Sequence, residues 1–153
     1  MKTRTIHSIG HSNRDIEHFI AILKSFDIKI LADIRSIPAS AYCPQFNRLH
    51  LMQALRREGI RYVHMPELGG RRTGGFLPYM QTKEFKEAVK FLEEIAGMQK
   101  AAFMCSEANW QQCHRSLISG QLYRSDWDVQ HIRDVRLSEP HMEQVKQGAL
   151  FFG

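Results

Sequence analysis

The chain has 153 residues, of which 43% are apolar and 24% are charged, and its formal net charge is +5. This length predicts one domain over residues 1–153 with a substantial hydrophobic core, and the composition is that of a soluble globular protein. No apolar run approaches the roughly 20 residues that a membrane-spanning helix requires, which excludes a transmembrane protein. The moderate positive charge suits a phosphate-bearing partner and equally a surface of solvated lysines.

Hydrophobic periodicity divides the chain into alternating strands and helices. In chain order, strands are predicted over residues 5–9, 29–34, 60–65, 101–105 and 128–132, and helices over residues 13–26, 47–59, 82–97, 111–122 and 140–147. Proline and glycine place irregular loops over residues 36–45 and 66–81. Loops as long as the second one are usually functional or mobile in a compact domain.

Polar residues, glycine and proline mark the predicted helix ends. Ser12 stands three residues before Asp15, which is a variant of the capping box at the start of a helix. Thr82 is expected to cap a later helix in the same way. Gly59 is expected to end the second helix, and Pro140 to open the terminal one.

Strands that alternate with helices at this spacing predict βαβ units and a parallel sheet. Right-handed crossovers place helices on both faces, so we expect a three-layer, Rossmann-like α/β domain with about five mainly parallel strands. The carboxyl ends of parallel strands share one edge, where ligands bind. Polar clusters follow four of the strands, at residues 10–12, 33–36, 68–72 and 105–107. The sequence therefore predicts one pocket built from distant segments.

The first cluster, Gly10-His11-Ser12, opens the first predicted helix. Backbone N–H groups at a helix start can hold an anion, and the Ser12 hydroxyl can contribute to such a site or serve only as the helix cap. His11 has no structural reason to stand at a strand end, which favours a functional role.

The second cluster contains Asp33 and Arg35, which point to the same face of an extended strand. Two roles are open. Arg35 can bind a planar anion, with Asp33 as a general base or nucleophile, or the two can form an internal salt bridge that fixes the next loop. A charged pair in so apolar a strand needs partners in either case.

The third cluster holds the paired glycines Gly69 and Gly70, followed by Arg71. Paired glycines let the backbone approach a ligand closely, and the arginine adds a cation. The segment matches neither the dinucleotide fingerprint nor the P-loop, and a simple turn is the alternative.

The fourth cluster combines Cys105 and Glu107 with Cys113, His114 and Arg115 at the next helix start. Cys105 is a candidate thiolate nucleophile, activated by a helix N-terminus and by His114 or Arg115. Glu107 is a candidate general base or carboxylate nucleophile, and Cys113 is expected to face the core as a small apolar residue. A zinc site is the weakest alternative because the paired C-x2-C module and a fourth ligand are lacking, so no metal is expected.

The chain resembles the bacterial and archaeal family named domain of unknown function 488. The resemblance runs from residue 9 to residue 132, and its most specific part is Cys105-Ser106-Glu107 followed by Cys113-His114-Arg115-Ser116. Its other matching segments cover residues 33–38, 44–47, 59–64 and 68–71. The chain departs from the family pattern where a proline is expected shortly before Cys113. The resemblance implies these site candidates but no particular reaction, cofactor or substrate.

The residues favour a small enzyme, a hydrolase or transferase, that acts on a phosphate-bearing ligand such as a nucleotide or a nucleic-acid end. Its anion would be held by Arg35, Arg71, Arg115 and the amides of the first helix, with His11 or His114 orienting Glu107 or Asp33. One alternative is a non-catalytic module that binds nucleic acid or nucleotide, and another is a thiol-dependent enzyme that uses Cys105. The odd number of cysteines, which are Cys43, Cys105 and Cys113, without a signal peptide predicts reduced thiols and a cytoplasmic protein with no membrane partner. Cofactor and oligomeric state stay open.

Overall fold

A six-stranded sheet forms the centre of the protein, whose computed structural model describes residues 2–143. The strands are β1 (Arg4–Gly10), β2 (Ile30–Asp33), β3 (Arg61–His64), β4 (Ala101–Cys105), β5 (Trp127–Asp134) and β6 (Leu137–Pro140). Their order across the sheet is β3-β2-β4-β1-β5-β6. Strands β1 to β5 run parallel, and β6 pairs antiparallel with β5 at one edge.

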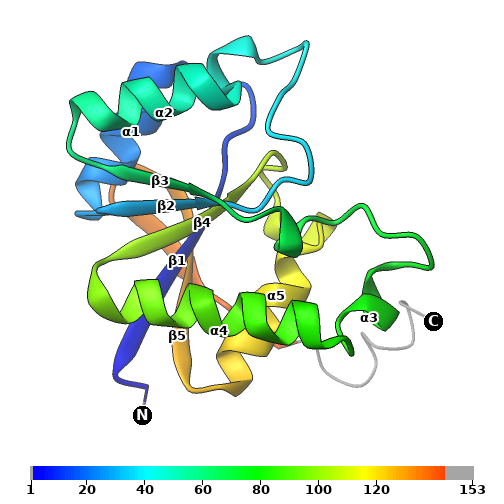
Figure 1. Ribbon diagram of the computed structural model, residues 1–153. Coiled ribbons are helices and arrows are strands. Elements are labelled where there is room, and N and C mark those ends of the chain that lie inside the picture. Colours follow the sequence, from blue (N-terminus) through cyan, green and yellow to red (C-terminus); the bar gives the residue numbers. More distant parts are fainter. Residues whose placement is uncertain (1, 144–153) are drawn as a thin grey trace.

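Helices cover both faces of this sheet and give the protein three layers (Figure 1). Helices α1 and α2 lie on one face, and α4 and α5 lie on the other. The helices are α1 (Ile16–Ser25), α2 (Arg48–Arg57), the short α3 (Phe76–Tyr79), α4 (Lys83–Met98) and α5 (Arg115–Arg124). Single 3-10 turns also occur, at Pro44–Phe46, Pro66–Leu68 and Trp110–Gln112. None of the helices within residues 2–143 has both the length and the apolar character that a membrane crossing demands.

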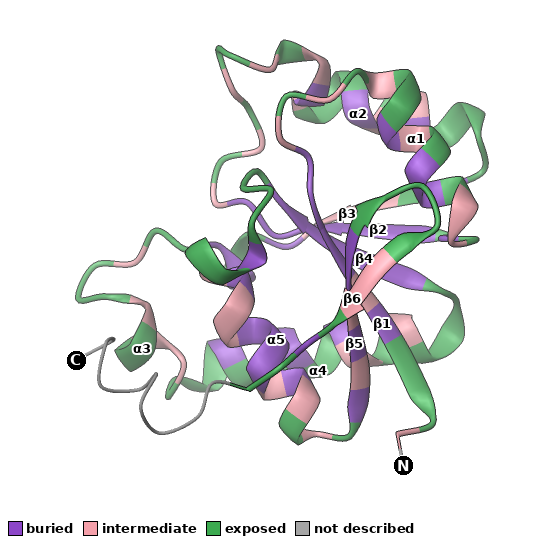
Figure 2. Ribbon diagram, turned by 180° about the vertical axis from the view of Figure 1, so that it is seen from behind, coloured by how far each residue is buried: buried purple, intermediate pink, exposed green. Residues whose placement is uncertain are grey.

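Two hydrophobic cores form because side chains alternate between the faces of each strand. In β4, Ala102 and Met104 pack beneath α1 and α2, whereas Phe103 and Cys105 pack beneath α4 and α5. All five residues of β4 are buried, and Figure 2 shows buried residues concentrated along the central strands. A strand that is buried on both faces reads as a continuous apolar run, which is how the sequence predicted it.

The structure confirms the predicted α/β class, the mainly parallel sheet and several helix ends. Thr82 caps α4, because its Oγ1 atom accepts a hydrogen bond from the Phe85 amide at 3.2 Å. Gly59 follows α2 with φ of +75°, the left-handed conformation that commonly ends a helix.

Two predicted helix starts are wrong. Ser12 does not cap α1, which begins at Ile16, and Ser12 instead lies in a tight turn with φ of +50°. Pro140 does not open a helix but ends β6, which is the edge strand of the sheet within residues 2–143, where a missing N–H is tolerated. Residues 144–147 of that predicted helix lie outside the described residues.

The predicted helix over residues 111–122 is also shifted. The chain first makes the 3-10 turn at Trp110–Gln112, and α5 begins only at Arg115. The Asn109 side chain caps the turn by accepting a hydrogen bond from the Gln111 amide at 3.0 Å. The path between β4 and α5 is therefore a compact loop, which holds Cys113 close to the end of β4.

Candidate functional site

Loops that follow four parallel strands meet at the carboxyl edge of the sheet (Figure 1). They enclose a pocket of about 510 Å³. The described residues that line it are His11, Arg35, Ser36, Ile37, Ala39, Ser40, Gly70, Arg71, Cys105, Ser106 and His114. The sequence predicted this convergence from the shared edge of parallel strands, and the structure confirms it.

Asp33 and Arg35 form a buried salt bridge beside the pocket. Arg35 Nε donates to Asp33 Oδ1 at 2.9 Å, and Arg35 Nη2 donates to Asp33 Oδ2 at 2.7 Å. The Tyr62 hydroxyl also donates to Asp33 Oδ2, and burial with this hydrogen bond raises the pKa of Tyr62. Asp33 is fully buried and lies outside the pocket lining, so its carboxylate orients Arg35 and does not face a ligand.

His11 is fixed as a neutral imidazole. Burial lowers its pKa from 6.5 to about 4, and the nearby Arg35 charge acts in the same direction. Its Nε2 atom lies 3.4 Å from Arg35 Nη1, which can only donate, so Nε2 accepts and Nδ1 donates to the Ser12 carbonyl at 2.7 Å. The ring stacks on Phe46 with centroids 4.4 Å apart. His11 therefore supports Arg35 from the pocket wall.

The glycine pair lets two loops approach each other more closely than side chains would allow. A Cβ atom on Gly69 would lie 2.2 Å from Ser36 Oγ and 2.7 Å from Ser36 Cα. A Cβ atom on Gly70 would lie 2.8 Å from His114 Nδ1. Gly69 thus joins the loops behind the pocket, and Gly70 leaves room for His114 in the pocket wall.

Arg71 carries a polar group that is open to a ligand, and His114 lines the pocket beside it. Arg71 is exposed at the pocket, and its backbone amide donates to Ser36 Oγ at 3.1 Å. The His114 ring rests edge-on against Phe76, with centroids 5.2 Å apart. Its Nε2 atom is buried and has no hydrogen-bond partner among the described residues. A buried nitrogen of this kind favours a partner from outside the chain.

Two sulfur atoms meet at the base of the pocket. Cys105 Sγ and Cys113 Sγ lie 3.1 Å apart, and the Arg115 amide donates to Cys113 Sγ at 3.2 Å. The hydrogen bond with Cys105, assisted by His114 and Arg115, lowers the pKa of Cys113 although burial opposes the shift. The same bond, together with burial, raises the pKa of Cys105. The two sulfurs therefore share a hydrogen bond that favours one thiol and one thiolate within the pair.

Arg115 is a buried cation close to the sulfur pair. Its side chain is 1% exposed, and its Nη2 atom donates to the carbonyls of Glu107 at 3.0 Å and Ala108 at 3.2 Å. Its Nε and Nη1 atoms have no hydrogen-bond partner in the described part of the chain. The amide and the charge of Arg115 add to the larger effect of the Cys105 hydrogen bond in lowering the pKa of Cys113.

Five sequence candidates lie outside the pocket lining: Asp33, Arg115, Glu107, Ser12 and Gly69. Glu107 is exposed, and its carboxylate accepts from the Asn109 amide at 3.4 Å. The amides of His11 and Ser12 donate to the carbonyls of Cys105 and Ser106, both at 2.9 Å. These amides extend the pairing of β1 with β4, so they are not available to cradle an anion as the sequence suggested.

The prediction that Cys113 faces the core is only partly correct. It does pack against the core under α4 and α5, but it is half-buried and contacts Cys105. The sequence also did not single out Ser36, Ser40 and Ser106, whose hydroxyl groups belong to lining residues. The only signal for Ser36 and Ser106 is that each belongs to a polar cluster just after a strand, and Ser40, seven residues after β2, has no such signal.

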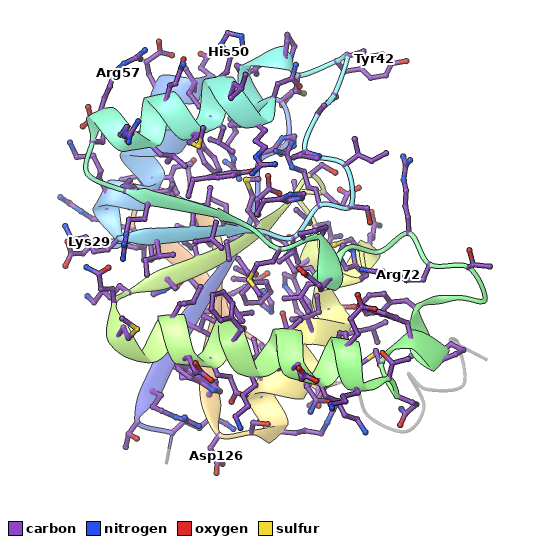
Figure 3. All side chains as sticks on the ribbon, viewed as in Figure 1. Lys29, Tyr42, His50, Arg57, Arg72 and Asp126 are labelled. Carbon is purple, nitrogen blue, oxygen red and sulfur yellow. The ribbon has the colours of Figure 1, made fainter. Side chains whose placement is uncertain are left out.

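Tyr42 shows how far the loop after β2 extends beyond the pocket. Its side chain is 96% exposed and points away from the body of the molecule (Figure 3).

Within residues 2–143, no group of three His, Cys, Asp or Glu side chains is arranged to hold a metal ion.

Comparison with known families identifies the lineage of the chain. A family model described as "Domain of unknown function DUF488" matches residues 15–122, which is more than half of the chain. The chain therefore belongs to this family. The match covers every described lining residue of the pocket except His11. Searches of curated proteins and of solved structures found no similar protein.

Proposed function

We propose that the protein is an enzyme that acts on a phosphate-bearing ligand, such as a nucleotide or a nucleic-acid end, bound in this pocket. The carrying observation is the chemistry of the described lining, which has two arginines, two histidines and three serines and no acidic residue. Guanidinium and hydroxyl groups are the donors that phosphate oxygens bind. The volume of about 510 Å³ falls in the range of roughly 300–1,000 Å³ that is typical of small-molecule sites.

Arg71 supplies the free positive charge of this pocket in our proposal. The charge of Arg35 is balanced by Asp33 at 2.7 Å. Arg35 therefore helps to orient the ligand by hydrogen bonding and adds little net charge to the pocket. Arg71 is exposed and its guanidinium forms no ion pair with another described residue. His114, whose Nδ1 atom faces Gly70 at the pocket, offers the second contact for a phosphate oxygen.

Cys105 is the nucleophile in this proposal. Asp33 and Glu107 lie outside the lining, whereas Cys105 belongs to it. Cys105 Sγ and Cys113 Sγ lie 3.1 Å apart and share one proton in this proposal, so attack by Cys105 Sγ on an electrophilic centre of the ligand leaves that proton on Cys113. The leaving group departs from a ligand that is then linked to sulfur. Attack by water or by a second substrate on that linkage completes a hydrolysis or a group transfer.

Ligand binding is tested by thermal unfolding of the reduced protein with inorganic phosphate, mononucleotides and a short single-stranded DNA. A ligand at 100 times its dissociation constant adds about 2.7 kcal/mol to the free energy of unfolding. Arg71→Gln should weaken binding about tenfold, which is the loss of one charge-assisted hydrogen bond. The matched control is Arg57→Gln on the outer surface of α2 (Figure 3), which should leave binding unchanged. No stabilisation by any probe, or equal losses in both variants, would contradict the proposal.

Turnover then separates an enzyme from a binding module. Ligands that stabilise the protein are incubated with it, and products are followed by ³¹P NMR. Cys105→Ser should retain ligand binding and lose product formation. A non-catalytic module would bind every ligand without product, and its affinity would fall steeply with salt.

A further inference from the structure

The contact between Cys105 and Cys113 joins two segments with different surroundings. Cys105 ends β4 and lines the pocket, whereas Cys113 stands in the loop just before α5. Their Sγ atoms are 3.1 Å apart, and a disulfide bond is about 2.05 Å long. Closing this gap requires a sulfur movement of about 1 Å. The third cysteine, Cys43, packs beside the core on the opposite face of the sheet, under α1 and α2.

The surroundings also favour exchange chemistry at this pair. Thiol–disulfide exchange needs a thiolate that can be reached and a second thiol that resolves the mixed disulfide. The partly exposed Cys113 accepts from the Arg115 amide and lies beside the buried Arg115 guanidinium, which has unpartnered nitrogens. Cys105 is the resolving thiol, already in contact with Cys113.

We propose that Cys105 and Cys113 form a reversible disulfide by exchange with a small-molecule disulfide that reaches the partly exposed Cys113. Cys113 Sγ attacks one sulfur of the small disulfide, whose S–S bond breaks as a mixed disulfide forms. The first small thiolate leaves and takes the proton of Cys105. Cys105 Sγ then attacks Cys113 Sγ and expels the second small thiolate, which takes a proton from water. Two protein thiols lose two electrons in total, and the small disulfide gains them.

The disulfide changes the pocket itself. It removes the Cys105 nucleophile and closes residues 105–113 into a covalent loop that contains Ser106. Oxidation therefore switches off the chemistry of the pocket, and this consequence rests on the proposed function. Formation of the disulfide does not rest on it, because no phosphate ligand takes part in the exchange.

The test is a redox titration of the Cys43→Ser protein with reduced and oxidised glutathione, without any phosphate ligand. Samples are quenched in acid, alkylated and weighed by intact mass spectrometry. The expected result is that two thiols disappear together, that no glutathione is retained and that added reductant restores both thiols. Free thiols at every glutathione ratio, or glutathione adducts that accumulate without closure, would overturn the proposal.

Two further variants identify the attacking sulfur. In the Cys43→Ser background, Cys105→Ser should trap glutathione on Cys113, because the resolving thiol is absent. Cys113→Ser should react much more slowly, since Cys105 alone is buried and protonated. Equal trapping in both variants would overturn the assigned order of attack. Ligand binding is measured separately on reduced protein, so failure of the disulfide and failure of the phosphate proposal are distinguishable.

Discussion

Arg35 and Arg115 are two buried arginines beside the same pocket, and their partners differ. Arg35 is held by both oxygens of Asp33 and by the Phe46 carbonyl at 2.8 Å. Arg115 meets two carbonyls, has two nitrogens without a partner among the described residues, and lies beside a pair of sulfurs. Arg35, whose charge is balanced by a carboxylate, holds the neighbouring wall of the pocket in place. A cation with incomplete partners shifts the ionisation of its neighbour, which is where chemistry can occur.

Breaking the complete pair should have the largest effect. Asp33→Asn leaves Arg35 buried with no carboxylate and should lower the free energy of unfolding by about 3–5 kcal/mol. Urea unfolding measures the change. The exposed pair of Lys24 and Glu58 is the control, and Glu58→Gln should cost less than about 1 kcal/mol. The double variant Asp33→Asn/Arg35→Met should recover part of the loss. An Asp33→Asn protein as stable as the wild type would contradict the claim that buried Arg35 depends on the Asp33 carboxylate.

A smaller effect is expected where Gly70 faces His114. Gly70→Ala places a Cβ atom 2.8 Å from His114 Nδ1, so His114 or the loop must move, at about 1–3 kcal/mol. Gly97→Ala is the matched control, because a Cβ atom there meets nothing within 4 Å and a helical alanine is favoured over glycine. Urea unfolding of both variants gives the difference. Equal stability would show that His114 does not depend on this close approach.

The neutral state of His11, which lies beside Arg35, can be tested through the pH dependence of stability. The pKa of His11 is about 4 when folded and about 6.5 when unfolded, so the unfolded chain binds more protons between these values. The free energy of unfolding should therefore fall as the pH drops from 7 to 5, by about 1–2 kcal/mol for this imidazole. His11→Asn should reduce the pH dependence, whereas His50→Asn on the exposed surface of α2 should not. An unchanged dependence in His11→Asn would contradict the assignment.

The sheet and the edge that carries the pocket follow from the sequence because they depend on periodicity and chain handedness. Apolar runs such as Ala101–Cys105 mark buried strands, and parallel strands bring their polar ends together. These rules do not decide how a side chain is used within the edge. The sequence allowed two roles for Asp33, contact with a ligand or a salt bridge within the protein. Only the three-dimensional positions of Arg35 and Tyr62 distinguish between them.

The sulfur pair could not be predicted for a related reason. The loop from Cys105 to Cys113 has no periodic pattern, so its path depends on local contacts such as the Asn109 cap and the Arg115 hydrogen bonds to Glu107 and Ala108.

The last strand, β6, was missed because Pro140 is typical of a helix start and equally tolerated at a sheet edge.

The most direct test of the account is the pH profile of Cys113 alkylation in the folded protein. Iodoacetamide labelling is followed by peptide mass spectrometry between pH 5 and pH 9, with the urea-unfolded protein as the control. Because its contacts with Cys105, His114 and Arg115 lower the pKa of Cys113, the rate for the folded protein should change much less over this range than the rate for the unfolded chain. In the unfolded chain the rate should rise about tenfold per pH unit up to about pH 8.5. The same rise in the folded protein would show that these contacts do not favour the Cys113 thiolate, and would contradict the account.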